Sequence, residues 1–533
     1  MSIRAHKRTW LSLLAVGALV ASVTAAGPAA ADPNNNSPQK LTKAVTVEGV
    51  LEHLRALQAI SDANGGDRAA GRPGYAASVD YIVDRLTAAG YAPTVQAFEF
   101  PYFEENSELV QLSPTPISYV DGTDFNRNGF VPTFIGQATG TVTPVDVVLP
   151  PPPAPNSNSS GCEAADFAGF PAGNVALLQR GTCGFSVKTL NAQAAGASAV
   201  ILFNEGQPGR TGLVTPIGAT PGLAIPVVFA TFATGNALAA PGPRTVRVKV
   251  DFLSETRTSW NVFAESDEGN PNNVVMAGAH LDGVQDGPAI NDNGTGSAAI
   301  LEVAEQMSKV KPNAKVRFAW WGAEEEGLLG SEHYIDTLPQ AEQDKIALYL
   351  NFDMVGSPNY FFGIYDGDNS GGTAPPGFIP PGSAQIEDVF EKFYADRGLP
   401  KDDTEFSGRS DYGPFIAVGI PAGGLFTGAE GVKTAAQAGR YGGVAGAAYD
   451  PCYHQPCDSF TPVADGANAA LYAQLNALYD LDGNVNVHAL DVNADAIATA
   501  VITFAFDTST VNGVRAPGKS HGAGNSEHAG AAS

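Results

Sequence analysis

A chain of 533 residues is several times longer than a typical single domain, so we expect a sizeable core and at least two domains. Its composition, with 44% hydrophobic and 16% charged residues, 60 glycines and 38 prolines, is typical of a loop-rich globular protein and argues against a chain that is disordered throughout. The net charge of -25 argues against nucleic acid and anionic membrane surfaces as partners, because both would repel the protein at long range.

The N-terminus has the pattern of a secretory signal peptide. Three basic residues precede an apolar run from about Trp10 to Val23, and small residues follow as far as Ala31. Because this run is shorter than the ~20 residues of a membrane span, we predict a cleaved signal over residues 1–31 and a secreted, extracellular protein. We expect no membrane span in the rest of the chain.

Export would place all four cysteines in an oxidising compartment. Their spacing suggests two local disulfides, Cys162 with Cys183 and Cys452 with Cys457. Catalytic thiols are therefore not expected.

Residues 40–129 are predicted to form the first part of one domain. Apolar residues recur at helical spacing over 45–66 and 74–93, and glycines occur at or near the end of each stretch. The β-branched and aromatic residues of 94–103 then predict a strand.

The composition changes near Asn126. As far as about Phe252, short Val, Ile and Leu runs alternate with Gly and Pro, which predicts an inserted β-rich domain over residues 130–252. In residues 253–506, strands alternate with helices, which predicts a mostly parallel, mixed central sheet flanked by helices. Residues 507–533 lack apolar periodicity and are predicted to be a disordered tail.

Polar side chains directly follow three of the expected strands. The strands and the residues after them are 273–279 with His280 and Asp282, 315–321 with Glu324 and Glu325, and 346–352 with Asp353. Active sites in open α/β sheets form at the carboxyl ends of strands. Clustered acids there would repel one another unless a cation is bound, and the mixture of imidazole and carboxylate favours Zn²⁺, with Mn²⁺ and Co²⁺ as alternatives.

Asp292 lies 12 residues after His280, just before a helix expected to begin near Thr295. Taken alone, it would be interpreted as a helix cap or turn residue. Beside His280 and Glu325, a carboxylate that bridges two metal ions is the better interpretation.

Five motifs in this order resemble a known family. They are AHLDGVQDGPAINDNGTGSAAILE, RFAWWGAEEEGLLGSEHY, YLNFDMVGSPN, GRSDYGPF and YDPCYHQPCD. They are similar to those of secreted bacterial leucyl aminopeptidases of the co-catalytic di-zinc exopeptidase family, over about residues 258–480 and the N-terminal helices. The resemblance implies a zinc-aminopeptidase-like α/β sandwich, two zinc ions per subunit and hydrolysis of the N-terminal bond of peptides. It also implies a preference for large apolar N-terminal residues such as leucine.

The resemblance assigns a metal ligand to five positions. His280 and Asp353 match the ligands of one zinc, Glu325 and His454 match those of the other, and Asp292 matches the bridge between them.

Four further positions match residues around the metals. Glu324 resembles the general base, Asp282 the acid that orients the ligand imidazole, and Tyr453 the tyrosine that hydrogen-bonds the tetrahedral intermediate. Arg409 matches a position near the substrate cleft, with a surface ion pair as its alternative. Asn293 departs from the pattern, because relatives often have a second acid there.

The inserted stretch resembles a protease-associated domain. The resemblance rests on QRGTCGF at Gln179–Phe185, followed by an expected helix and strand. It implies a domain that shapes access to the active site and carries no chemistry.

Three rival functions share this type of fold. A carboxypeptidase or dipeptidase would need basic residues for the substrate carboxylate, and the motifs are poor in them beyond Arg409. A non-catalytic receptor-like homologue would have lost ligands, and a glutaminyl cyclase works with one zinc, whereas this chain has the full ligand set. Calcium is a candidate further ion because of the acidity, although no EF-hand loop is present. A monomer is expected, and His53 and His333 are interpreted as ordinary helix histidines.

Overall fold

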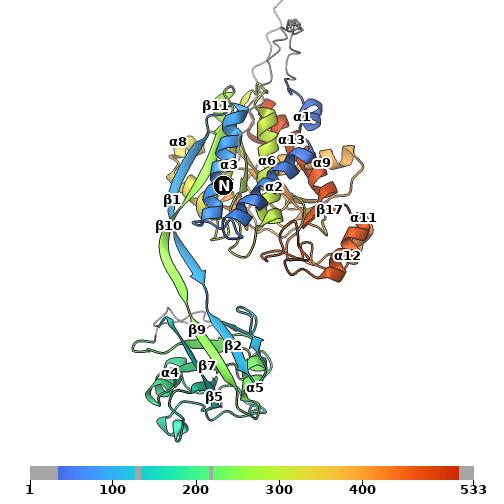
Figure 1. Cartoon of the computed structure of the whole chain (residues 1–533). Coiled ribbons are helices and arrows are strands. Elements are labelled where there is room, and N and C mark those ends of the chain that lie inside the picture. The colour runs from blue at the N-terminus through green and yellow to red at the C-terminus, as the bar shows by residue number, and fades with distance from the viewer. Residues whose placement is uncertain (1–33, 127–133, 215–219, 515–533) are drawn as a thin grey trace, which may run out of the picture.

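The computed structural model describes residues 34–126, 134–214 and 220–514. The expected signal peptide (1–31) and residues 515–533 of the expected tail lie outside this range. The described chain forms two bodies joined by a twisted two-stranded ribbon (Figure 1).

The larger body is built on an eight-stranded mixed sheet. In sheet order its strands are β1 (Thr94–Glu105), β10 (Phe252–Glu265), β12 (Ala314–Trp321), β11 (Asn270–His280), β13 (Ile346–Phe352), β16 (Ala422–Phe426), β14 (Gly363–Tyr365) and β15 (Asp402–Thr404). The four central strands β12, β11, β13 and β16 are parallel neighbours. Antiparallel pairs extend the sheet on both sides. The expected fold class, a mixed sheet flanked by helices, is therefore confirmed.

Helices cover both faces of this sheet. One face packs against α1 (Pro38–Ala44), α2 (Val47–Ala63), α3 (Pro73–Ala89), α6 (Gly296–Met307), α9 (Ser383–Asp396) and α13 (Val487–Phe506). The other face packs against α7 (Leu329–Thr337) and α10 (Gly413–Ala417). Successive side chains of β13 point to opposite faces of the sheet, so the strand contributes to the hydrophobic core on each face. Leu348 and Leu350 pack in the core under the first group of helices, and Tyr349 packs in the core under α7 and α10. Short elements complete this body: α8 (Gln340–Gln343), α11 (Ala435–Tyr441), α12 (Ala469–Leu478), β17 (Leu481–Asp482) and β18 (Val485–Asn486).

Local signals in the sequence fix the first long helices. Thr46 caps α2 by accepting a hydrogen bond from the Gly49 amide, and proline occupies the first turn of α3. Gly90 ends α3 with φ of 102°, a conformation that glycine adopts without steric cost.

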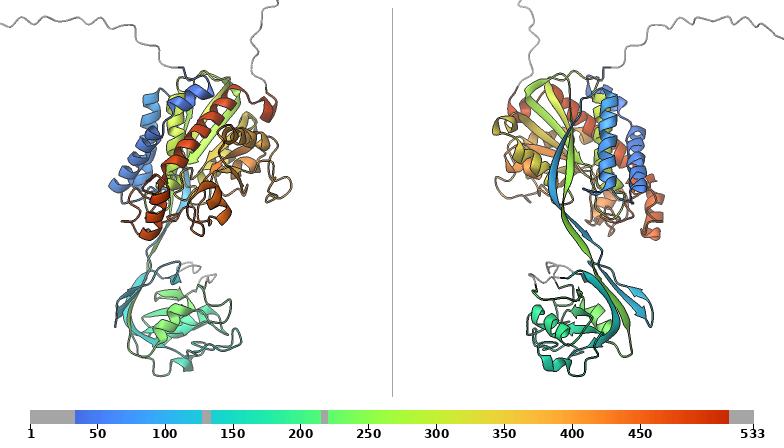
Figure 2. Two further views of the ribbon diagram at one scale, coloured as in Figure 1. Left: turned by 90° about the vertical axis from the view of Figure 1, so that its right-hand side faces the viewer. Right: turned by 60° about the vertical axis from the view of Figure 1, so that its left-hand side comes forward.

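Helix α13 is the one described helix that is long and apolar enough to cross a membrane by length and composition, which the sequence analysis did not expect. Two thirds (67%) of its most apolar window is buried inside the fold. The helix packs along β11 and β12 as a core element (Figure 2, left).

The chain continues in order beyond α13. Thr508 receives a hydrogen bond from the Asn273 side chain at 3.0 Å, and α14 (Ser509–Asn512) follows. The ordered fold therefore extends to Val514, past the expected start of the tail at residue 507.

The smaller body contains a second eight-stranded sheet. Its strands in sheet order are β3 (Ile117–Ser118), β2 (Glu108–Ser113), β9 (Thr245–Val250), β5 (Gly136–Pro144), β6 (Val175–Gln179), β7 (Ala199–Phe203), β8 (Val227–Ala230) and β4 (Phe125–Asn126). Helices α4 (Phe185–Ala194) and α5 (Phe232–Ala239), a 3₁₀ turn (Ala164–Phe167) and the Cys162–Cys183 disulfide complete it. Because β2, β3 and β4 belong to this sheet, the insert begins before the expected boundary at residue 130.

Strands β1 and β10 form the ribbon between the two bodies. They pair from Thr94 with Phe263 to Glu105 with Phe252, so the chain enters and leaves the insert at adjacent points. Figure 2 shows the insert beyond the end of this ribbon, apart from the larger body.

Candidate active site

A cavity of ≈ 290 Å³ opens at the carboxyl ends of β11, β12 and β13. Of the residues predicted from the sequence, it is lined by His280, Asp292, Glu324, Glu325, Asp353, Arg409, Tyr453 and His454. Asp282 is fully buried and is not among its lining residues. The structure therefore brings together residues that are up to 174 positions apart in the chain (280 to 454).

Two groups of possible ligands meet at Asp292. His280 Nε2 lies 3.4 Å from Asp292 Oδ1 and 3.4 Å from Asp353 Oδ1. On the other side, His454 Nε2 lies 3.3 Å from Asp292 Oδ2 and 3.0 Å from Glu325 Oε2. Each oxygen of Asp292 thus faces a different histidine, as a bridging carboxylate would.

The residues present fit zinc. Ligand atoms at about 2.1 Å from one tetrahedral ion are separated by roughly 3.4 Å, close to the separations found in both groups. Glu325 Oε1 and Asp353 Oδ1 are buried without a hydrogen-bond partner. Buried, unpaired carboxylate oxygens beside imidazole nitrogens are suited to a cation.

The electrostatics of the site are dominated by burial and by its own acids. Burial raises the pKa of Glu325 to about 7, with the neighbouring Asp292 adding to the effect. Against the effect of burial, Asp292 and Glu325 raise the pKa of His454 to about 10. Burial also raises the pKa of Glu324 well above its usual range, with Asp411, Asp353 and Glu325 adding to the effect.

The backbone is strained at and beside the candidate ligands. His454 itself, Met354 after Asp353 and Ala323 before Glu324 have φ of 55°, 48° and 56°. Each non-glycine residue in this left-handed region costs about 1 kcal/mol or more, and such strain gathers at functional sites.

Asp282, which the resemblance assigns to the orientation of the ligand imidazole, contacts both His280 and the turn that carries the two glutamates. His280 Nδ1 lies 3.0 Å from the backbone oxygen of Asp282 and 3.8 Å from its Oδ1, so the backbone carbonyl is the closer partner. The Asp282 carboxylate instead accepts hydrogen bonds from the amides of Glu324 and Glu325, at 3.2 and 3.4 Å. It thereby holds the turn that carries both glutamates.

Asn293, the departure from the expected pattern, also has a structural task. Its side-chain oxygen accepts hydrogen bonds from the amides of Gly296 and Met354, at 2.9 and 3.1 Å. These bonds join the Asp292 loop to the loop after Asp353. A side chain at Gly296 would not fit, because its Cβ would lie 2.2 Å from the Phe352 carbonyl oxygen.

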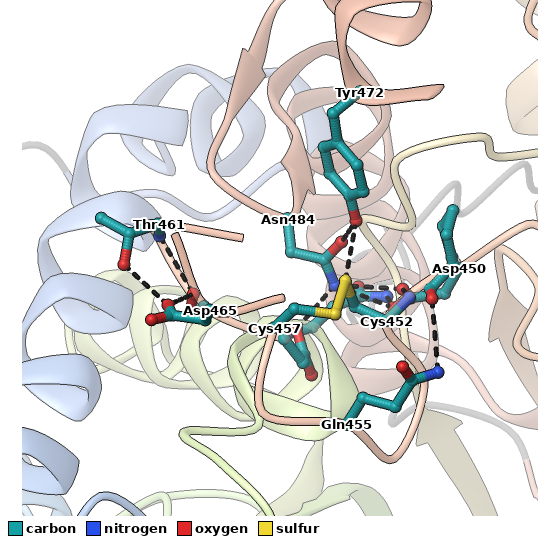
Figure 3. Close-up of a disulfide and its surroundings, with 12 residues drawn as sticks. Asp450, Cys452, Gln455, Cys457, Thr461, Asp465, Tyr472 and Asn484 are labelled. Carbon is teal, nitrogen blue, oxygen red and sulfur yellow. Dashed lines mark hydrogen bonds between the residues drawn. A yellow bond between two sulfur atoms is a disulfide. The ribbon is translucent and has the colours of Figure 1, made fainter. Parts of the chain in front are cut away.

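The loop that presents His454 is closed by the expected Cys452–Cys457 disulfide. Figure 3 shows this bridge with Asp450, Tyr472 and Asn484 around it. The side-chain nitrogen of Asn484 donates hydrogen bonds to both carboxylate oxygens of Asp450, each at 3.1 Å. Tyr453 follows in the loop, and its ring stacks on that of His454 with centroids 3.8 Å apart.

Two supporting residues were not identified from the sequence. Asp458 accepts hydrogen bonds from the amides of Asn291 and Asp292, at 2.8 and 3.0 Å. The buried Arg68 donates to the carbonyl oxygens of Leu281, Pro288 and Ala289 and so braces the chain between His280 and Asp292. In the sequence, the position of Asp458 next to Cys457 was the only indication of its role. Nothing in the sequence around Arg68 indicated a role at the site.

Arg409 lies at the edge of the cavity. Its side chain is 72% exposed and lies 3.4 Å from Glu430. The structure thus contains both features that the sequence analysis treated as alternatives, a surface ion pair and a position in the cleft.

Comparison with known proteins identifies both bodies. Residues 261–478 match peptidase family M28, and residues 139–238 match the PA domain. An aminopeptidase of Pseudomonas aeruginosa is 45% identical over 481 residues, which cover 90% of this chain and 84% of that protein. Leucine aminopeptidase 2 of Arthroderma otae is 41% identical over 409 residues, covering 75% and 77% of the two chains.

Solved structures show the same fold. An aminopeptidase from Aneurinibacillus has a TM-score of 0.50 and 26% identity, covering 87% of this chain and 95% of its own. A zinc aminopeptidase from Bacillus subtilis has a TM-score of 0.53 and 22% identity, with 88% and 98% covered. The chain therefore belongs to peptidase family M28, with a PA domain inserted in it.

Proposed function

We propose that this zinc aminopeptidase is secreted, holds two zinc ions in its cleft and removes large apolar residues from the N-termini of peptides. The observation that carries the proposal is the position of Asp292, whose two oxygens face His280 and His454 at 3.4 and 3.3 Å. We assign His280, Asp292 and Asp353 to one ion and Asp292, Glu325 and His454 to the other. Zinc bound there would polarise the scissile carbonyl and acidify a water molecule.

We assign the proton transfer to Glu324. Its Oε2 lies 3.9 Å from His280 Nε2, so it borders the metal ligands, and it lines the cavity. As an ionised carboxylate beside the metal ligands, Glu324 would take a proton from the attacking water and pass it to the leaving amine. Tyr453 also lines the cavity, and we assign its hydroxyl to hydrogen bonding of the carbonyl oxygen that becomes negative during attack.

The charge of the cleft favours an N-terminal amine over a C-terminal carboxylate. The cavity is lined by six acids; Asp292, Glu325 and Asp353 would be neutralised by the two ions, which leaves Glu324, Glu405 and Glu430 to make the lining acidic. Among its described lining residues, Arg409 is the only lysine or arginine, and Glu430 already pairs with it. A carboxypeptidase or dipeptidase would need a free cation here, so aminopeptidase action is the better fit. We assign Arg409 to the substrate-binding edge of the cleft.

The preference for large apolar residues is supported by the cavity wall. Met354, Phe361, Phe426 and Tyr449 contribute apolar surface to the lining. Such a wall would bury a leucine side chain, a gain of about 1.5–3 kcal/mol. The leucine aminopeptidases among the relatives support the same preference.

Secretion is supported by the N-terminal pattern of the sequence and by two disulfides, which persist in oxidising compartments. We propose that the chain acts as a monomer on free peptides. Calcium is proposed only as an accessory ion, so calcium alone should not restore activity to chelated protein.

The decisive experiment is a panel of Leu-, Arg-, Glu- and Pro-anilides with N-acetylated controls. We expect cleavage of Leu-anilide to be fastest, to stop after chelation and to return when zinc is added back, reaching full turnover only once both ions of the cleft are bound. Cleavage of the acetylated controls would contradict aminopeptidase action. Full recovery with one zinc would contradict the two-ion assignment.

A further inference from the structure

A second cluster of metal-binding side chains lies away from the cleft, between helices α2, α3 and α6. At the centre of this cluster is His53 of α2, whose side chain is 1% exposed. Its Nδ1 lies 2.8 Å from the hydroxyl of Tyr81 on α3. Its Nε2 has no hydrogen-bond partner. That nitrogen faces Glu302 Oε2 and Glu305 Oε1 of α6, each at 3.8 Å.

These separations suit a shared ion better than direct hydrogen bonds. Nitrogen and oxygen atoms in a hydrogen bond approach to about 2.7–3.2 Å. Two ligand atoms at about 2.1 Å from one zinc ion lie roughly 3.4 Å apart in an ideal tetrahedron, and a separation of 3.8 Å corresponds to an angle at the ion of about 130°. The ligand atoms of His53, Glu302 and Glu305 all lie within 4.8 Å of one another. Glu302 and Glu305 are three residues apart on α6, which places them on one face of the helix.

The surrounding contacts hold both carboxylates toward His53. Glu302 Oε1 accepts hydrogen bonds from the Thr46 amide at 3.3 Å and from Gln306 at 3.4 Å, while Oε2 faces the imidazole. A Cβ at position 49 would lie 2.7 Å from the Glu302 carboxyl carbon, so the glycine on α2 leaves room for this acid.

The charges around the cluster leave an excess of acid. Arg85 of α3 contacts both oxygens of Glu305, at 2.7 and 2.9 Å, and also contacts Glu52 at 3.0 Å. Arg85 therefore pairs with Glu305 and Glu52, and no cation among the described residues pairs with Glu302 except the imidazole of His53. A divalent cation between His53 and the two α6 glutamates would balance this excess. Glu305 is 16% exposed and Arg85 is 32% exposed, which gives solvent access at this edge.

We propose that His53, Glu302 and Glu305 form an additional zinc site, separate from the catalytic cleft, that ties α2 to α6. Imidazole with two carboxylates is a ligand set that zinc accepts, with water completing the coordination. Because α6 begins directly after the Asp292 loop, the bound ion would brace the helix at the back of the active site. Its role is structural, and it takes no part in peptide hydrolysis.

The test counts metal per chain in the full-length protein by native mass spectrometry and elemental analysis after equilibration with ZnCl₂. We expect His53→Gln and Glu302→Gln each to bind one zinc ion fewer than the wild type. His333→Gln is the matched control, because this histidine is also on a helix but stacks on Phe98 with centroids 5.3 Å apart. It should bind as many ions as the wild type.

Activity distinguishes this site from the cleft. His53→Gln should keep Leu-anilide turnover at saturating zinc, whereas loss of an ion from the cleft would abolish it. Because the readout is the difference of one ion between variant and wild type, it does not depend on whether the cleft holds one ion or two.

A measurement on the wild type guards against variants that fail to fold. Crystals soaked in ZnCl₂ should show an anomalous zinc peak between His53 and Glu302. Equal metal content in wild type and His53→Gln, or no such peak, would overturn the proposal and leave a buried histidine that interacts with two glutamates directly.

Discussion

The backbone amide of Asp292 donates a hydrogen bond to Oδ2 of Asp458 at 3.0 Å, and so the loop that carries the proposed bridging ligand is tied to the loop that carries His454. Asp458 Oδ1 accepts the neighbouring Asn291 amide at 2.8 Å and the Asn484 side chain at 2.8 Å. One buried carboxyl thus positions a ligand loop on each side of the site.

Asp458→Asn should weaken zinc binding without removing a ligand. The amide offers one acceptor oxygen in place of two, so one of the two backbone amides loses its partner. Residues that orient metal ligands are typically worth about 10–100-fold in metal affinity or activity. The measurement is the free zinc concentration at half-maximal Leu-anilide turnover. Asp482→Asn, which removes a surface partner of Arg55, is the control, and an equal effect in both variants would argue against positioning by Asp458.

Glu324→Gln should lose most of kcat and keep its zinc. The amide cannot accept the water's proton, and general-base catalysis typically contributes about 10²–10⁴-fold. Turnover of Leu-anilide and metal content are measured on the same sample. Glu326→Gln is the matched control, since Glu326 is two residues away and outside the cavity lining. Retained turnover in Glu324→Gln would remove Glu324 as the base.

Removal of the insert should change the preference for long or short peptides more than it changes the rate of bond cleavage. The described residues that line the cavity all lie between His280 and His454, so none comes from the insert. Since Glu105 pairs with Phe252, an Asn-Gly turn in place of residues 106–251 would close the ribbon as a hairpin. We expect unchanged kcat/KM for Leu-anilide and altered kcat/KM for long peptides. Unchanged kinetics on both would refute a role in access.

Glu387→Gln should stabilise the protein above neutral pH. Burial raises the pKa of Glu387 to about 7 from 4.5, and the nearby acids Asp368, Asp403 and Asp366 add to the effect. Between pH 4.5 and 7 the folded state therefore holds a proton that the unfolded chain releases, so stability falls as pH rises through this window.

Glutamine mimics the protonated form at every pH. The free energy of unfolding of Glu387→Gln should exceed that of the wild type by about 1–2 kcal/mol above pH 7, after allowance for solvent screening, and match it near pH 4. Urea unfolding at both pH values measures this difference. A constant difference at both pH values would contradict titration of Glu387 as its source.

The sequence was sufficient to predict the larger body and the chemistry of its site. Strands β11, β12 and β13 follow from short apolar runs, and the acids and histidine at their ends point to a cation because such residues are costly to bury together. These signals are local, within a few residues along the chain. The resemblance of five motifs then assigned Asp292 and His454 as further candidate ligands.

Only the tertiary structure decided which groups meet. The Asn291 amide and Asp458 are 167 residues apart in sequence, and Arg68 lies 213 residues from the Leu281 carbonyl that it contacts. His53 gave no sign of its two glutamate neighbours, which lie about 250 residues away on α6. Periodicity fixes which face of an element is buried, but pairing between distant elements depends on how the whole chain packs, and no local pattern records it.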